Sequence, residues 1–268
     1  MDQVKDYSTL IIEISNNVGK IKLNRPNKGN SITLELAKEL YEISEYYKNN
    51  EEVKVVVLEG NGKHFSVGGD LASFADTGAN ITAHLREVTV FLHKAINNFV
   101  SMKKPVIAIV NGTVAGAGIG LICSADIVIA SEKAQFVMAY TKAGLTPDGA
   151  SSYFLPRLIG MKKSLELTLL NRMISAEEAE SWGLVTKVCK EEEIESEVKE
   201  IEINLVEGAT EALGKAKALL YESFNNSLLE QMEYESLEIS KSASTSEGYE
   251  GISAFLEKRK PNFMKKVY

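Results

Sequence analysis

The sequence predicts an α/β fold in which helices join parallel strands, followed by a C-terminal region made of helices alone. Short apolar runs rich in β-branched residues alternate with segments of helical hydrophobic spacing along most of the chain. Successive strands joined by helices pair in parallel, with right-handed crossovers. From Glu191 onward only the helical spacing is found. These three observations define the expected fold class.

The N-terminal part is predicted to begin with a β-hairpin and a helix. Two β-prone runs, Thr9–Ile14 and Val18–Leu23, are separated by a polar turn. A helix is expected over Thr33–Tyr47, because Thr33 is a suitable N-cap and Glu35 lies in the first turn.

The middle of the chain is predicted to hold the centre of the sheet. Val53–Leu58 is almost continuously apolar, which is typical of a strand covered on both faces. A loop with four glycines follows at Gly60–Asp70. Ile81–Val100 has helical spacing, and Val106–Val110 is short and β-branched, which favours a second buried strand. A short buried helix is expected at Leu121–Ala125.

The rest of the chain shows a strong helix signal. Ser175 and Glu178 form a capping-box pattern, and Gly183 is expected to end the helix that they begin. Further strands are expected at Asp126–Ala130, Gln135–Met138 and Leu184–Val188, and helices at Ser151–Ile159, Lys163–Leu170, Ile194–Leu205, Glu211–Phe224, Leu228–Ser242 and Glu247–Glu257.

Length and composition favour one globular domain with a helical appendage. The chain has 268 residues, of which 44% are hydrophobic, and we place a core domain at 1–200 and a helical C-terminal region at 201–268. The net charge of −7 argues against broad binding to nucleic acid or anionic membranes. No signal-peptide core and no membrane-length apolar run is found, so a cytoplasmic protein is expected. Cys123 and Cys189 lie far apart, without metal or redox spacing.

Two glycine-rich segments follow predicted strands, at residues 66–70 and 115–120. Glycine lets a backbone approach a ligand closely and present its N–H groups, and a helix start adds free donors and a positive dipole end. Open α/β sheets bind ligands beyond the carboxyl ends of their strands. Each segment alone is compatible with an ordinary turn, but together they predict a place to hold an oxygen that becomes negative during a reaction.

The motifs NGTVAGAGIGLICSADIVIAS at 111–131, KHFSVGGDL at 63–71 and GLTPDG at 144–149 occur in an order that resembles the enoyl-CoA hydratase/isomerase family, the crotonase superfamily. The likeness covers about residues 9–263. It implies a spiral of ββα units with a helical C-terminal trimerisation region. It also implies an acyl-CoA thioester as substrate, no metal or redox cofactor beyond the coenzyme A of the substrate, and a homotrimer or homohexamer.

The resemblance implies specific roles for the two loops. The backbone N–H groups of Gly69 and Ala117 are expected to form an oxyanion hole for the thioester carbonyl. Many family members carry glycine where Ala117 stands, and alanine keeps the N–H. For Asp70 a bond to neighbouring loop N–H groups is favoured, and for Lys28 a solvated side chain is an equal alternative to a contact with the CoA nucleotide. Substrate contacts are expected from Lys28, Ser66, Val67, Gly68, Asp70, Leu71, Gly116 and Tyr140.

The carboxylates indicate which reaction to expect. Hydratases of the family use two glutamates, and those positions correspond here to Gly120 and Tyr140, which cannot act as carboxylate bases. Tyr140 is a pocket wall or a hydrogen-bond partner of the substrate, and the wall is favoured. Asp148, in a Pro-Asp-Gly segment, is either a turn residue or the base. Double-bond isomerases of the family, nearest those of the PaaG type that act on ring-derived CoA thioesters, carry an acidic residue there.

A single base beside an oxyanion hole favours an isomerase that moves a double bond from the 3-enoyl to the 2-enoyl position. A hydratase, a thioester hydrolase and a decarboxylase remain alternatives, because an oxyanion hole serves all of them. An RNA-binding or inactive relative is opposed by the net charge and by Asp148. His64, His84 and His93 share no ligand spacing, and a surface or core role is favoured for each.

Overall fold

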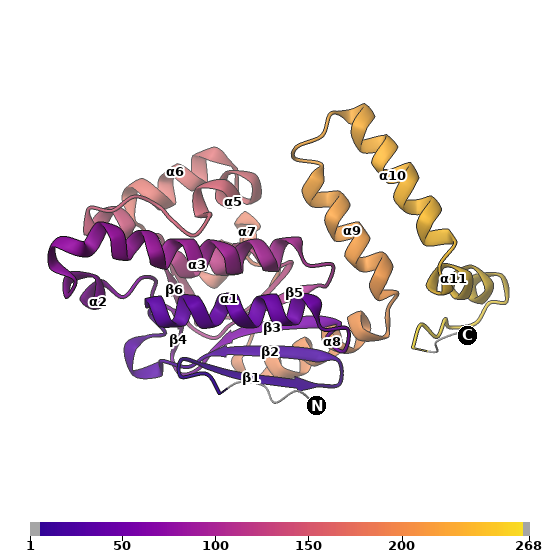
Figure 1. Ribbon diagram of the computed structural model, residues 1–268, viewed down its shortest axis with the longest axis horizontal. Coiled ribbons are helices and arrows are strands. Elements are labelled where there is room, and N and C mark those ends of the chain that lie inside the picture. The colour runs from indigo at the N-terminus through magenta and orange to yellow at the C-terminus, as the bar shows by residue number, and fades with distance from the viewer. Residues whose placement is uncertain (1–5, 265–268) are drawn as a thin grey trace.

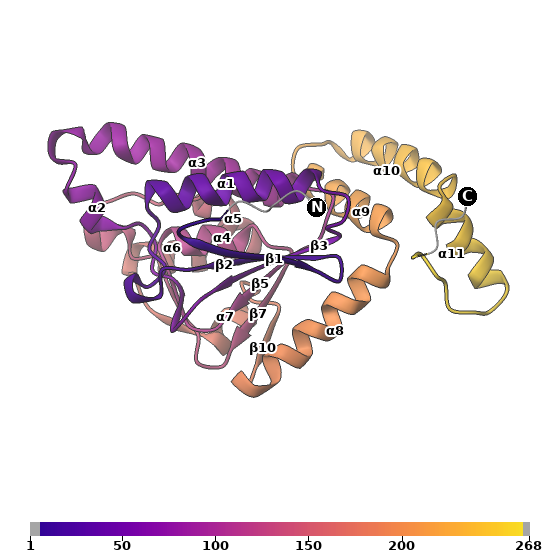
Figure 2. The ribbon, with the colours of Figure 1, turned by 60° about the horizontal axis from the view of Figure 1, so that its bottom comes forward.

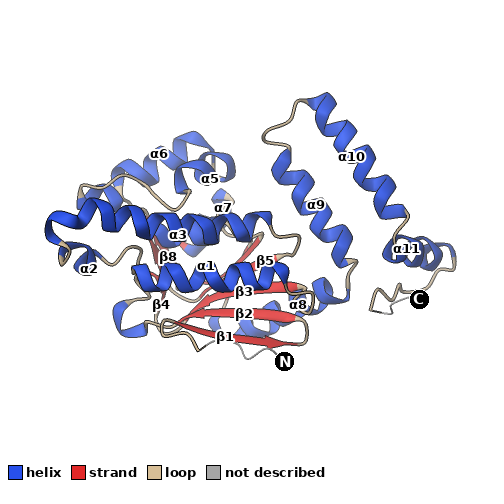
Figure 3. Cartoon of the chain, viewed as in Figure 1, coloured by secondary structure: helices blue, strands red, loops and turns tan. Residues whose placement is uncertain are grey.

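Two β-sheets organise residues 6–264, the part of the chain that the computed structural model describes (Figure 1, Figure 3). The larger sheet contains, in spatial order, β1 (Leu10–Ser15), β2 (Val18–Leu23), β3 (Val55–Gly60), β5 (Val106–Val110), β7 (Ile127–Ser131) and β10 (Lys187–Cys189). The smaller sheet contains β4 (His64–Ser66), β6 (Thr113–Ala115), β8 (Gln135–Val137) and β9 (Ile174–Ser175). The predicted α/β class is confirmed.

Helices follow or connect these strands. They are α1 (Leu34–Asn49), α2 (Leu71–Ala75), α3 (Ile81–Ser101), α4 (Ala117–Cys123), α5 (Ser151–Leu158), α6 (Gly160–Leu170), α7 (Ala176–Trp182), α8 (Ile194–Glu207), α9 (Thr210–Glu222), α10 (Leu228–Ala243) and α11 (Ser246–Leu256).

Pairing in the larger sheet follows the predicted topology. β1 and β2 form an antiparallel hairpin, and every other neighbouring pair is parallel. After β3, β5 and β7 the chain makes a short strand of the smaller sheet, β4, β6 and β8 respectively, before the next helical segment. This repetition is the spiral of ββα units that the family resemblance implies.

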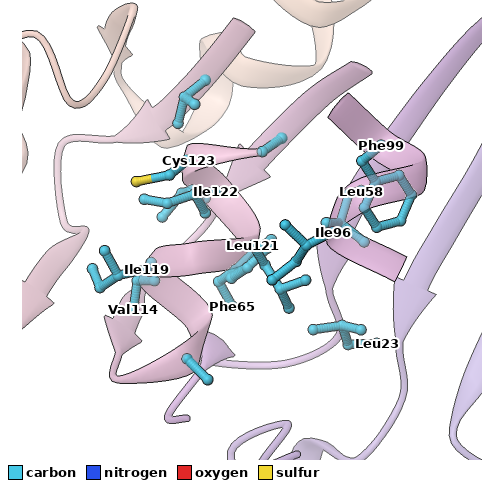
Figure 4. Packing of buried hydrophobic residues seen from close by; sticks show 14 of the residues in the cluster. Leu23, Leu58, Phe65, Ile96, Phe99, Val114, Ile119, Leu121, Ile122 and Cys123 are labelled. Atoms are coloured by element: carbon cyan, nitrogen blue, oxygen red, sulfur yellow. The ribbon is translucent and has the colours of Figure 1, made fainter. Parts of the chain in front are cut away.

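The central strand β3 is buried on both faces, as its apolar run predicts. Val56 and Leu58 belong to the main core, together with side chains of α1 and α3. Val55 and Val57 point to the other face and pack near α8. Figure 2 shows α1 and α3 on one side of the sheet and α8 on the other. Figure 4 shows how the side chains of α4 and α3 meet those of the strands in this core.

Several boundaries differ from the prediction for local reasons. α4 begins at Ala117 rather than Leu121, since the segment before Leu121 is helical although it contains Gly118 and Gly120. β10 begins at Lys187 rather than Leu184, because the Leu184 N–H is used to close the end of α7. The predicted capping box of α7 is only half formed. The Ser175 side chain accepts a hydrogen bond from the Glu178 N–H, but the Glu178 carboxylate binds Arg172, at 2.7 and 2.5 Å, and not the Ser175 N–H.

The C-terminal helices α9, α10 and α11 extend to one side of the α/β body (Figure 1). α8 packs on the sheet and spans residue 200, so the predicted 200/201 boundary lies inside a helix that belongs to the core; that division of the chain stays a prediction. Within residues 6–264 no helix has the length and apolar character that crossing a membrane demands. Both cysteines are buried and unpaired.

Candidate active site

Two glycine turns meet at one edge of the smaller sheet. β4 and β6 pair in parallel, so both turns leave the sheet at the same end. Gly68 has a φ of +90° and Gly116 a φ of +51°, which glycine tolerates best. A Cβ atom on Gly68 would lie 2.9 Å from the Ala115 carbonyl oxygen and 3.3 Å from the Ala117 nitrogen. The two loops touch because these positions have no side chain.

Each turn presents one backbone N–H that has no acceptor within residues 6–264. Ile32 forms a parallel bridge around Gly69, donating to the Gly68 carbonyl at 2.8 Å and accepting from the Asp70 N–H at 3.0 Å. The Gly69 N–H therefore faces away from Ile32. Ala117 is the first residue of α4, so its N–H lacks an intrahelical acceptor. Its φ is not positive, so the backbone conformation is an ordinary one for alanine. Alanine at this position thus keeps the donor in a relaxed backbone.

Both N–H groups belong to residues that line one cavity of about 270 Å³. Seven predicted site residues lie on its wall: Val67, Gly69, Leu71, Gly116, Ala117, Tyr140 and Asp148. The remaining wall is largely apolar and comes from the segment before α1, from α2 and α3, and from residues 139–147: Ile32, Phe74, Leu85, Val88, Thr89, Leu92, Ala139, Ala143, Leu145, Thr146 and Pro147. The cavity suits an apolar acyl group whose carbonyl oxygen faces the two turns.

The other four predicted contacts lie off this wall. The Ser66 hydroxyl is buried, donates to the Asn30 carbonyl at 2.9 Å and accepts from the Gly68 N–H at 3.2 Å, so it shapes the turn from behind. Gly68 contacts the second turn, as described above. Lys28 is exposed in the 3₁₀ turn Pro26–Lys28 and does not reach the cavity.

Asp70 is held by the protein rather than offered to a ligand. Its carboxylate accepts hydrogen bonds from Arg25 at 2.9 Å, Ser31 at 2.9 Å and the Ser73 N–H at 3.1 Å, which caps α2. Burial opposes ionisation of Asp70, but these hydrogen bonds and the Arg25 charge outweigh it and hold its pKa below the usual value. The favoured structural interpretation of Asp70 agrees with this geometry.

Asp148 is brought to the cavity by close backbone packing against α4. Gly149 has a φ of +61°, and a Cβ atom on Gly120 would lie only 1.9 Å from the Gly149 carbonyl oxygen. The Asp148 carbonyl accepts from the Ser151 N–H at 3.2 Å and from its hydroxyl at 2.7 Å, which fixes the turn. The turn of Asp148 and Gly149 therefore occupies the space that a side chain at Gly120 would need. A carboxylate at position 120 has no room.

His93, on α3, is the site residue that sequence reasoning missed. Its Nε2 lies 2.7 Å from Oδ1 of Asp148. The hydrogen bond and the charge of Asp148 raise the pKa of His93 above its usual value, against the opposing effect of partial burial. A signal was present, because His93 follows Leu85 and Thr89 at helical spacing and both line the cavity.

Tyr140 forms part of the wall, as favoured from the sequence. Its hydroxyl is buried and has no hydrogen-bond partner among the described residues. Burial, and after it the charge of Asp148, raise its pKa, so the phenol stays protonated at neutral pH. No group of three or more metal-ligating side chains occurs in residues 6–264.

Comparison with solved structures identifies the class of fold. A putative enoyl-CoA hydratase from Streptomyces coelicolor A3(2) superposes with a TM-score of 0.92 at 28% identity, covering 98% of this chain and 96% of that one. The protein therefore has the crotonase fold, which confirms the architecture that the resemblance implies.

Sequence comparison identifies the family. The family model described as enoyl-CoA hydratase/isomerase matches residues 13–266. The chain is 30% identical to a trans-2-decenoyl-[acyl-carrier-protein] isomerase of Streptococcus mutans, over 96% of this chain and 98% of that protein. It is 32% identical to the 1,2-epoxyphenylacetyl-CoA isomerase of Escherichia coli, over 95% and 97%. The chain belongs to the enoyl-CoA hydratase/isomerase family.

Proposed function

We propose that the protein is an acyl-CoA isomerase that moves a carbon–carbon double bond from the 3-enoyl to the 2-enoyl position, or acts likewise on a ring-derived CoA ester. The observation that carries the proposal is the composition of the cavity wall. Among the described residues that line it, Asp148 is the single acid, and it shares the cavity with Gly69 and Ala117.

The proposed reaction uses two hydrogen bonds and one shuttled proton. The N–H groups of Gly69 and Ala117 bind the thioester carbonyl oxygen, which makes the α-hydrogen more acidic. The ionised Asp148 removes that hydrogen as a proton and leaves a dienolate whose negative charge rests on the bound oxygen. The protonated Asp148 then returns the proton to the γ-carbon, so that the double bond lies between the α- and β-carbons. No cofactor is invoked beyond the coenzyme A of the substrate.

A hydratase is the second candidate, because relatives with that name share the fold. Hydration needs a water molecule that is held and deprotonated, which the family achieves with two carboxylates. Here one position is Gly120, where a side chain would collide with the Gly149 carbonyl, and the other is Tyr140. The site thus supports isomerisation better. Hydrolysis and decarboxylation of a thioester stay further alternatives with no specific observation in their favour.

Self-association is part of the proposal. Large apolar side chains on α9 to α11 are widely exposed in the single chain, among them Leu220 at 72% and Phe255 at 83%. Apolar surface of this extent is typical of a contact between proteins. We propose a homotrimer or homohexamer formed through these helices, with an acyl-CoA thioester as the small-molecule partner. A contact of Lys28 with the CoA nucleotide remains a proposal as well.

The test compares wild type with Asp148→Asn, which keeps the shape of the side chain and its hydrogen bond to His93 but cannot take a proton. Isomerisation of a 3-enoyl-CoA is followed through the absorbance of the conjugated product, and hydration of a 2-enoyl-CoA through its loss. We expect isomerisation to predominate in wild type and to fall by about 10²- to 10⁴-fold in Asp148→Asn, with ester binding retained. Predominant hydration, or unchanged isomerisation in the variant, would refute the proposal.

A further inference from the structure

His93 and Asp148 come from elements far apart in the chain, and they meet through one hydrogen bond beside the cavity. We propose that His93 is a positioning residue for the base. Its Nε2–H holds Oδ1 of Asp148 and thereby turns Oδ2 toward the substrate. This inference rests on the proposed function, since it assigns His93 a part in that reaction.

The main chain of Asp148 is fixed, but its side chain depends on His93. Ser151 holds the carbonyl through two hydrogen bonds. Two torsions remain free in an aspartate side chain. In the described part of the chain, the bond from His93 to Oδ1 is the one hydrogen bond found for the carboxylate, and Oδ2 has none. A carboxylate that rotates freely would meet the α- and γ-carbons only part of the time.

The chemistry of the pair determines the tautomer. An ionised carboxylate only accepts hydrogen bonds, so Nε2 must carry the hydrogen. The other ring nitrogen, Nδ1, has no hydrogen bond to residues 6–264, and half of the His93 side chain is exposed, at 51%. His93 lines a second cavity of about 490 Å³ between α3, α5 and α9, whereas Asp148 lines the first. His93 on the wall of the second cavity is therefore hydrogen-bonded to Asp148 on the wall of the first.

The charge on His93 acts on the carboxylate that the imidazole contacts. Four ionisable groups face the imidazole or share its cavity: Asp148 on the loop before α5, Tyr153 on α5, and Tyr221 and Glu222 on α9. Of these, Asp148 makes the direct contact. When His93 is an imidazolium, its hydrogen bond to Oδ1 is charge-assisted and holds the carboxylate charge away from the substrate. When His93 is neutral, the hydrogen bond persists without the added positive charge, so the carboxylate stays positioned and is freer to react.

The experiment compares three variants in the full-length protein. His93→Gln places an amide N–H at a similar reach but does not titrate. His93→Leu removes the donor. Asn97→Ala is the matched control. Asn97 lies one turn further along α3, is exposed and lines the second cavity, and it forms no hydrogen bond with Asp148. The measurements are kcat and KM for the 3-enoyl-CoA against pH, together with thermal melting.

The expected results separate positioning from folding. In wild type, kcat should rise with pH as His93 loses its proton, with a pKa above that of free histidine. In His93→Gln this rise in the kcat–pH profile should be absent, because glutamine does not titrate. His93→Leu should lose on the order of 10²-fold in kcat, with KM nearly unchanged, because the base is misplaced. His93→Gln should recover most of that loss, and Asn97→Ala should match wild type. Equal losses in the Gln and Leu variants, a Leu variant as active as wild type, or a pH step that survives in His93→Gln would overturn the proposal.

A double variant distinguishes this inference from the function on which it depends. If His93 acts through Asp148, adding His93→Leu to Asp148→Asn causes no further loss. A further loss equal to that of His93→Leu alone would show an independent role and refute positioning. Full turnover in Asp148→Asn would instead refute the proposed function itself, whatever His93 does.

Discussion

One of the two proposed oxyanion donors can be removed at Ala117 without disturbing the helix. This residue is the first of α4, where proline is well accommodated because its fixed φ suits a helix start and its missing N–H costs no intrahelical bond. Ala117→Pro therefore deletes one of the two N–H groups that face the cavity.

The magnitude follows from the role of such donors. Loss of one oxyanion-hole hydrogen bond in other enzymes lowers kcat by about 10²- to 10³-fold, or about 2.7–4 kcal/mol of transition-state stabilisation. Because the negative charge develops mainly in the enolate, KM should change much less than kcat. Ala117→Gly is the matched control, since it keeps the N–H at the same place in the backbone.

The assay is steady-state isomerisation of a 3-enoyl-CoA, with thermal melting to verify that both variants fold. We expect Ala117→Pro to melt near wild type and to be strongly impaired in kcat, while Ala117→Gly stays active. A folded Ala117→Pro variant with wild-type kcat would refute the assignment of this N–H to the oxyanion hole.

Two further predictions concern the stability of the fold. Gly120→Ala should destabilise the protein by about 1–3 kcal/mol and reduce turnover, because its Cβ would meet the Gly149 carbonyl at 1.9 Å and push on the turn that carries Asp148. Denaturant unfolding measures the first effect and kcat the second. A variant with unchanged stability and turnover would contradict the packing argument. Lys217→Met should cost about 3–5 kcal/mol, because Lys217 is 8% exposed, bonds Asp126 at 2.7 Å and would leave that carboxylate without its cation. Adding Asp126→Asn should restore part of the loss in unfolding free energy; no recovery would contradict the ion-pair explanation.

Much of the fold was predictable because its signals are local. The apolar run around Val56 predicted a strand covered on both faces, and β3 is buried in this way. The short strands β4, β6 and β9 and the helix α2 were not predicted, since two to five residues show no periodicity. The pairing of β4 with β6 nevertheless brings the two glycine turns together.

The site was predictable where its residues belong to local motifs. The turns at Gly69 and Ala117 and the acid at Asp148 were singled out by motifs that resemble the family, and the structure places all three on one cavity wall, while their catalytic roles stay predictions. The contact of His93 with Asp148 spans 55 residues and depends on how α3 crosses the loop before α5. The fit between Gly120 and Gly149 likewise arises only from tertiary packing.

Exchange of the substrate α-hydrogen with deuterium from solvent tests the central claim most directly, because it reports enolate formation whether or not the double bond moves. With a 3-enoyl-CoA in D₂O, the wild-type protein is predicted to catalyse α-exchange or deuterium incorporation at the γ-carbon, and Asp148→Asn to catalyse neither. If wild type isomerises the substrate without taking up deuterium from D₂O, the proton is passed on before it exchanges with solvent. A substrate labelled with deuterium at the α-carbon must then give a product that carries the label at the γ-carbon. Equal label transfer or exchange by wild type and Asp148→Asn would contradict the account.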